Sequence, residues 1–212
     1  MNSTELAALI TGALCSGLAV PALTTRGLRQ LGSPESNTHV LRTVGASVGA
    51  VVGATTVFAA LRVDNRVLAL PLAVWGVVLV AASSCDAVTQ RVPTALVRQA
   101  IVLVGLLLTS AFVLQRDWRG LLISMVAAAL SGLVLLLCWR LAGAGFGDVR
   151  LAFLGGLGLG HATHQGLLIA VIAMALATLV QTTIVLRRGG DLQTAIAFGP
   201  VLSVGFVIAM AV

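Results

Sequence analysis

The sequence predicts an all-α fold, a polytopic bundle of about eight transmembrane helices, with seven as the alternative count. The chain has 212 residues, of which 58% are hydrophobic and only 9% charged, whereas soluble domains are roughly 25% charged. The apolar residues form runs close to the roughly 20 residues that a helix needs to cross the hydrocarbon core of a bilayer. A water-soluble protein of this length has no interior large enough for so much apolar surface, so we expect one membrane-embedded domain over residues 1–212.

The apolar runs divide the chain into spans in the following order. The first run has no Lys or Arg before it, which favours a retained helix over a secretory signal peptide. The polar segment 24–42 after it contains Gly, Ser, Pro and Asn and predicts a loop. The sixth run is short and rich in glycine, which suits close helix packing, and residues 148–186 form either one span or two. The expected spans are 5–23, 43–61, 67–85, 95–115, 120–139, 148–163, 165–186 and 195–212.

The charges predict how the chain lies in the membrane. The net charge of +6 comes from 13 arginines scattered between the apolar runs, a pattern typical of topological anchoring rather than of nucleic-acid binding. With the N-terminus outside, the odd-numbered loops carry nine arginines: Arg26, Arg29, Arg42, Arg91, Arg98, Arg140, Arg150, Arg187 and Arg188. The even-numbered loops carry four: Arg62, Arg66, Arg116 and Arg119. Because cytoplasmic loops are enriched in Arg and Lys, this orientation in the inner (cytoplasmic) membrane is the predicted one.

Two aspartates stand at the edges of apolar runs. Asp86 ends the third run and Asp148 opens the sixth. A carboxylate at the edge of a bilayer core is costly and indicates a functional site. Two crossings separate these residues, so both are expected at the cytoplasmic rim, where an ionised and a protonated carboxyl can share one proton and activate water. The alternative is that they are interfacial carboxylates paired with Arg91 and Arg150.

The residues around each aspartate favour a site. Gly145 and Gly147 flank the turn before Asp148, and glycine permits close backbone approach and unusual dihedral angles. Pro93 follows Asp86 by seven residues and stops a helix from continuing through the loop. A Gly-x-Gly-Asp motif at a span boundary, with a second aspartate on the same face, is a specific combination.

With these motifs the chain resembles the type IV prepilin peptidase family of membrane aspartyl proteases. Asp86 with Val92-Pro93-Thr94 is similar to the first family motif, with Thr94 in place of the usual Asn. Gly145 to Leu151 is similar to the second, with Arg150 in place of Lys, and Phe198-Gly199-Pro200 gives a weaker third similarity. The resemblance covers residues 65–212. No paired Cys-x-x-Cys motif is present, so the chain resembles the short, peptidase-only form found with Flp/Tad pilus systems, which lacks the methyltransferase insert.

The resemblance implies an activity and a set of site residues. The implied enzyme is an aspartic endopeptidase that cleaves the basic leader of type IV or Flp-like prepilins or pseudopilins at the cytoplasmic membrane face. Asp86 and Asp148 are the implied catalytic pair, and the implied loop-shaping or substrate-contacting residues are Gly145, Gly147, Pro93 and Arg150. No metal or organic cofactor is implied, and the partners are a membrane-embedded substrate and the lipid bilayer, not nucleic acid.

Other interpretations remain open at this stage. A small proton-coupled transporter would use Asp86 and Asp148 as relay carboxylates, and internal repeats, which would favour it, are not evident. A structural membrane subunit would tolerate replacement of both aspartates. Cys85 beside Asp86 is a candidate nucleophile with no histidine near it in sequence, and His161 with His164 has a spacing that allows metal ligation on the outer face. The remaining aspartates are interpreted as loop carboxylates beside arginines: Asp64, Asp117 and Asp191.

Overall fold

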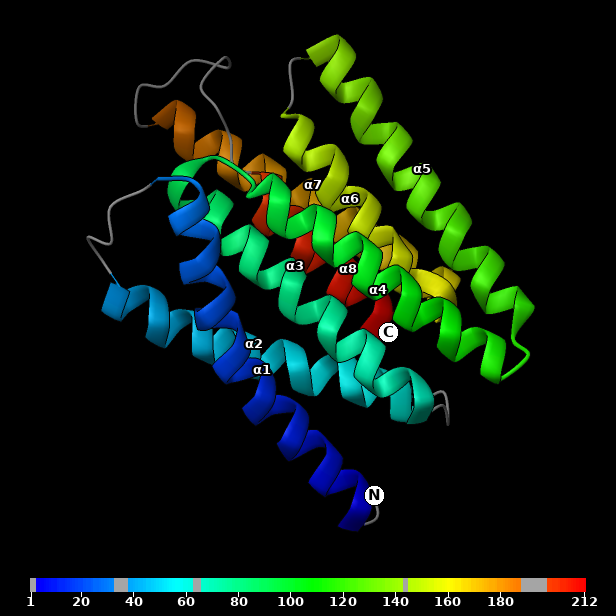
Figure 1. Ribbon diagram of the computed structural model, residues 1–212. Coiled ribbons are helices and arrows are strands. Elements are labelled where there is room, and N and C mark those ends of the chain that lie inside the picture. The colour runs from blue at the N-terminus through cyan, green and yellow to red at the C-terminus, as the bar shows by residue number, and fades with distance from the viewer. Residues whose placement is uncertain (1–2, 33–37, 63–65, 143–144, 188–197) are drawn as a thin grey trace.

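A computed structural model describes residues 3–32, 38–62, 66–142, 145–187 and 198–212, and within these residues the chain is helical with no strand (Figure 1). The expected all-α bundle is therefore confirmed, with one α-helix for each of the eight predicted spans. The α-helices are α1 (Ser3–Gln30), α2 (Thr38–Arg62), α3 (Ala69–Thr89), α4 (Thr94–Leu114), α5 (Trp118–Ala142), α6 (Phe146–Leu157), α7 (His164–Arg187) and α8 (Phe198–Ala211). Two short 3₁₀ helices, η1 (Arg66–Leu68) and η2 (Gly158–His161), adjoin α3 and α6.

Five of the described helices, α1 to α5, are long and apolar enough to cross a membrane. They identify the chain as an integral membrane protein. The sixth predicted span is a broken element, because α6 has only 12 residues and continues as η2. Since α7 begins separately at His164, residues 148–186 form two elements rather than one.

The loop predicted for residues 24–42 is much shorter in the structure. Helix α1 continues to Gln30 and α2 begins at Thr38, so residues 24–30 and 38–42 are helical. Gly32 follows the end of α1 and has a φ of 67°, a left-handed conformation that glycine adopts without steric cost. The polar residues there were misleading because polar side chains are compatible with the exposed end of a helix that extends beyond the apolar core.

Helix α3 is the centre of the bundle. It contacts α1, α2, α4, α6 and α8, and two thirds of its membrane window is buried, against 17% for α5. A helix that is apolar on all sides is expected to be enclosed by others. Figure 1 shows α3 passing between α1 and α2 on one side and α4 and α8 on the other. A polar residue on α3 is therefore surrounded by protein rather than by lipid.

Hydrogen bonds fix how α6 lies against its neighbours. Because α6 ends at Leu157, its last carbonyls have no partner within the helix. The Trp75 indole on α3 donates its N–H to the Leu154 carbonyl over 2.8 Å, and the Ser124 hydroxyl on α5 donates to the Leu157 carbonyl. Backbone groups in a membrane interior need such partners, so these two side chains stabilise the break after α6.

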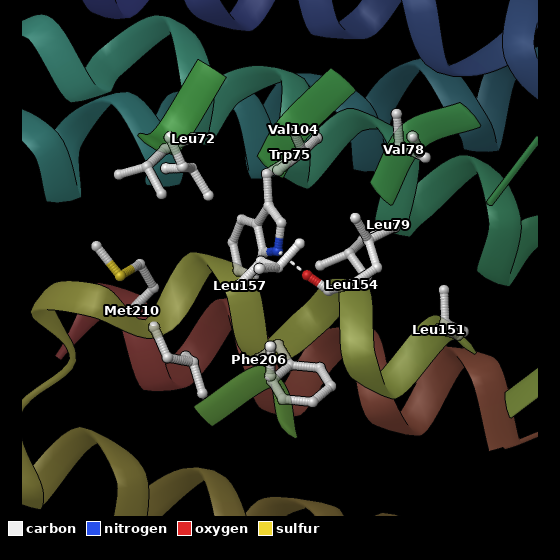
Figure 2. Close-up of a cluster of buried hydrophobic side chains, with 14 of the residues drawn as sticks. Leu72, Trp75, Val78, Leu79, Val104, Leu151, Leu154, Leu157, Phe206 and Met210 are labelled. Carbon is white, nitrogen blue, oxygen red and sulfur yellow. Dashed lines mark hydrogen bonds between the residues drawn. The ribbon is translucent and has the colours of Figure 1, made fainter. Parts of the chain in front are cut away.

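Helices α3 and α6 run in opposite directions. In Figure 2 the labelled side chains of α3, from Leu72 to Val78, follow the order opposite to those of α6, from Leu151 to Leu157. The C-terminal end of α3 therefore lies at the same end of the bundle as the N-terminal end of α6. This places the two ends that carry the candidate aspartates together.

The glycines of α6 and η2 allow close packing, as the sequence predicts. A side chain at Gly156 would meet the Ala127 carbonyl of α5 at 2.5 Å, and one at Gly160 would meet the Gly120 carbonyl at 2.8 Å. Both contacts are with backbone atoms, which cannot rotate away. The short α6–η2 element is thus held against α5 at the distance that glycine allows.

Candidate active site

Asp86 is a buried carboxylate in the last turn of α3. It is 4% exposed, and its Oδ2 accepts a hydrogen bond from the backbone N–H of Gly199 over 2.9 Å. Gly199 lies in the first turn of α8, where a backbone N–H has no partner within the helix and the helix end carries partial positive charge. Asp86 lies within the helix rather than after it, because α3 continues to Thr89 beyond the apolar run.

Asp148 is buried in the first turn of α6, with 7% exposure. Gly145 is the N-cap residue of this helix, and its carbonyl accepts a hydrogen bond from the Asp148 N–H over 3.0 Å. The Asp148 carboxylate turns back toward Gly145, where an added Cβ would lie 3.1 Å from its Oδ2, as acidic residues at the third helical position commonly do. The side chain is thus directed toward the N-terminal end of α6.

The two carboxyl groups lie at one end of the bundle. Asp86 and Asp148 come from helices that contact each other, and the segments beside them meet where Gly147 faces Val92. In the described part of the chain, no salt bridge joins either of them to an arginine. The interpretation of these residues as carboxylates paired with Arg91 and Arg150 is therefore not supported, and among the described residues the two buried acids have no cationic partner.

Gly147 brings the two motifs together. A side chain at this position would place its Cβ 2.7 Å from the Cβ of Val92, in the segment that follows α3. Gly147 has an ordinary helical φ, since Gly32 is the described glycine with positive φ. The sequence offered close approach or unusual dihedral angles as reasons for glycine here, and the structure shows close approach, to Val92 of the same chain.

The proline of the first motif begins a helix. Pro93 is the N-cap residue of α4, with φ −70° and ψ 92°, so α3 and α4 are separate helices as predicted. Its ring lies against α1, where a side chain at Gly27 would come within 3.2 Å of the Pro93 Cγ. The end of α1 thus supports the segment between Asp86 and α4.

Arg150 does not join the two aspartates. Its guanidinium lies 5.0 Å from the centre of the Phe146 ring, and the residue borders a cavity between α5 and α6 with Gly132 and Phe153. Residue 150 is two positions from Asp148, so the two side chains leave the helix on different sides. A role for Arg150 in binding substrate remains a prediction.

The other candidate residues have structural surroundings. Cys85 is fully buried, and its thiol donates to the Thr24 carbonyl over 3.5 Å, which leaves no access for a peptide. His161 contacts Asp117 at 3.1 Å, far from the pair, and Asp117 also caps α5 by accepting the Gly120 N–H over 2.9 Å. In the described ranges no group of three or more His, Cys, Asp or Glu side chains is placed to hold a metal. Asp64 and Asp191 lie outside the described residues.

Sequence reasoning missed two serines beside Asp86. Ser83 and Ser203 are buried, and their hydroxyls form a short hydrogen bond with each other. Ser83 precedes Asp86 by three residues, a spacing that puts both on one face of a helix. This spacing was the available signal, but serines are common in membrane helices, and only the approach of α8 distinguishes this one.

Comparison with known families gives a match to the type IV leader peptidase family over residues 73–185, which is more than half of the chain. The matched region contains Asp86, Asp148, all of α6 and most of α3. It ends before α8, so Gly199 and Ser203 lie beyond it. No curated protein and no solved structure matches the chain. The match confirms the family that the motifs predicted, and we conclude that this integral membrane protein is a protease that belongs to the type IV leader peptidase family.

Proposed function

We propose that the chain is an aspartic endopeptidase that removes the basic leader of type IV or Flp-like prepilins or pseudopilins. The observation that carries this proposal is the placement of Asp86 and Asp148, two buried carboxyl groups at the adjoining ends of the contacting helices α3 and α6. The membership of the chain in a leader peptidase family supports the substrate class.

The chemistry follows from the charge of the pair. Two buried carboxyl groups that share a site do not both ionise readily, so in this proposal they hold a single proton over an interval of pH. The ionised group takes a proton from a water molecule, and the water oxygen attacks the scissile carbonyl carbon. The protonated group donates a hydrogen bond to the carbonyl oxygen as negative charge develops there. The carboxyl that took the proton from water then gives it to the leaving nitrogen, the carbon–nitrogen bond breaks, and the tetrahedral intermediate collapses to the leader and the new N-terminus of the pilin.

The proposed site faces the cytoplasm. With the N-terminus outside, the end of the bundle that holds Asp86 and Asp148 is the cytoplasmic one, because the arginine-rich odd-numbered loops adjoin it. A prepilin has its basic leader on that side and its apolar helix in the bilayer. The bond to be cut then lies near the membrane surface, at the level of the pair.

Replacement of each acid tests this proposal. We expect Asp86→Asn and Asp148→Asn each to abolish processing of a co-expressed prepilin, measured as a gel shift, while membrane levels stay normal. Asp117→Asn is the matched control, since Asp117 lies at the other end of the bundle and asparagine also caps helices. Normal processing by either active-site variant would contradict the catalytic assignment. Proton-coupled flux through the wild type without cleavage would favour the transporter alternative.

A further inference from the structure

The backbone of Gly199 is held from both sides by α3. Its N–H donates to the Asp86 Oδ2 over 2.9 Å, and its carbonyl accepts from the Ser83 hydroxyl over 3.0 Å. Ser83 and Asp86 are three residues apart and so share one face of α3. The first turn of α8 is therefore attached to α3 by two bonds that meet at a single residue.

A second serine strengthens this attachment. The Ser203 hydroxyl, one turn further along α8, bonds to the Ser83 hydroxyl and lies 3.3 Å from the Leu79 carbonyl. Each hydroxyl carries one hydrogen. If Ser203 donates to Ser83, the hydrogen of Ser83 is available for the Gly199 carbonyl. Both hydroxyls and this carbonyl then have a partner.

Ser83 does not need α8 in order to have a hydrogen-bond partner. The Ser83 hydroxyl lies 2.7 Å from the Leu79 carbonyl of its own helix, a bond that would satisfy it without α8. Ser84 shows that case, since among the described residues its hydroxyl bonds only to the Val80 carbonyl one turn back, over 2.8 Å. The bonds from Ser83 to α8 therefore serve the contact between helices.

The contact between α3 and α8 leaves no space for a side chain at position 199. A side chain there would place its Cβ 2.8 Å from the Asp86 Oδ2 and 3.0 Å from the Asp86 Cβ. Only glycine brings the backbone N–H close enough to bond this carboxylate. Asp86, Ser83 and Ser203 are each at most 5% exposed, so these bonds lie in the interior of the bundle.

We propose that Ser83 and Ser203 are positioning residues that hold the Gly199 N–H of α8 against the Asp86 carboxylate. The proposal rests on the proposed function, in which Asp86 belongs to the catalytic pair. In this proposal the serines do not act on the substrate themselves. They act through Gly199, by fixing the rotation of the Asp86 side chain toward Asp148.

Kinetics of leader-peptide cleavage by the purified protein in detergent test this role. We expect Ser83→Ala and Ser203→Ala to lower kcat on the order of 10- to 100-fold with KM within twofold, because a misplaced catalytic group slows chemistry rather than binding. Ser84→Ala is the matched control and keeps wild-type kcat. Ser203→Thr restores most of the activity, since it retains the hydroxyl and its methyl group fits the cavity of about 260 Å³ that Ser83, Ser84 and Ser203 line.

Three outcomes overturn the proposal: wild-type kcat in Ser83→Ala, an equal loss in Ser84→Ala, or a raised KM with unchanged kcat. Asp86→Asn and Asp117→Asn are assayed alongside. If the wild type cleaves and Asp86→Asn does not, the proposed function stands whatever the serine variants do. If the wild type does not cleave, the proposed function fails and the network is judged by stability alone.

Thermal unfolding tests the hydrogen-bond network directly, and it can be measured for variants whose activity is too low for kinetics. Ser83→Ala is measured in the wild type and in Asp86→Ala, which removes the acceptor of the Gly199 N–H. We expect a smaller loss of Tm in the Asp86→Ala background, because residues in one hydrogen-bond network are not additive. Additive losses would show that Ser83 and Asp86 are independent, and would overturn the proposal.

Discussion

Trp75 of α3 donates its indole N–H to the backbone carbonyl of Leu154 in α6 over 2.8 Å (Figure 2). The bond links the two helices that carry the candidate catalytic aspartates. Trp75 is fully buried, and a side chain at Gly158 would come within 2.4 Å of its ring, so the indole has one position. It sets how far α6 is displaced along α3, and thereby whether Asp148 lies level with Asp86.

We predict that Trp75→Phe destabilises the protein. Phenylalanine keeps an aromatic ring but leaves the Leu154 carbonyl without a donor in a buried site, at a cost of about 1–3 kcal/mol in the free energy of unfolding. Denaturant unfolding in detergent measures this change. Trp118→Phe is the control, since Trp118 is 62% exposed, and it should unfold like the wild type. Equal stability of the two variants would show that the indole bond is dispensable.

We predict that Gly147→Val loses activity more than stability. The valine Cβ would lie 2.7 Å from the Val92 Cβ, and neither atom can rotate away, so the N-terminal end of α6 must shift from the segment after Asp86. Prepilin processing and membrane levels are measured together. Gly105→Ala is the control, because a side chain at Gly105 meets no atom within 4 Å. Wild-type processing by Gly147→Val at wild-type levels would exclude Gly147 from the site.

We predict that cleavage has an acidic and a basic limit of pH. In the proposed mechanism the pair of carboxyls is active with one proton: at low pH both carboxyls are protonated and the base is lost, and at high pH both are ionised and the hydrogen-bond donor is lost. The rate of leader-peptide cleavage across pH measures both limits. A rate that rises to a plateau without a basic limit would argue against a shared proton.

The thiol of Cys85 provides a separate control for that experiment. Because Cys85 is fully buried, we expect Cys85→Ser to retain activity and thiol alkylation of the folded enzyme to have no effect. Inactivation by an alkylator that Cys85→Ser prevents would make the thiol the nucleophile instead of a water molecule.

We predict that Gln30 and Arg119 lie on opposite sides of the membrane, with Gln30 in the cytoplasm. Both are exposed, at the end of α1 and the start of α5. In a background without native cysteines, a membrane-impermeant maleimide added to intact cells should label Arg119→Cys and should label Gln30→Cys only after permeabilisation. The reverse pattern would invert the topology and move the proposed site to the outer face.

The sequence alone determined the class of the protein and that its two aspartates lie at one end of the bundle. Hydropathy adds along the chain, so apolar runs of helix length give the membrane helices and their order without knowledge of their packing. Two crossings between Asp86 and Asp148 return the chain to one end of the bundle, whatever the tilt of each helix. The motifs around these residues were sufficient to identify the family.

The tertiary structure decided what surrounds each aspartate. Contacts between helices depend on rotation and axial displacement, and one apolar residue resembles another in hydropathy, so the Trp75–Leu154 bond has no counterpart in the pattern. Two contacts join segments that are distant in sequence. Gly147 lies against Val92, and Gly199 bonds to Asp86. A buried carboxylate is costly wherever it lies in the bilayer core, but its partner is whichever backbone the packing brings to it, and that is a property of the fold.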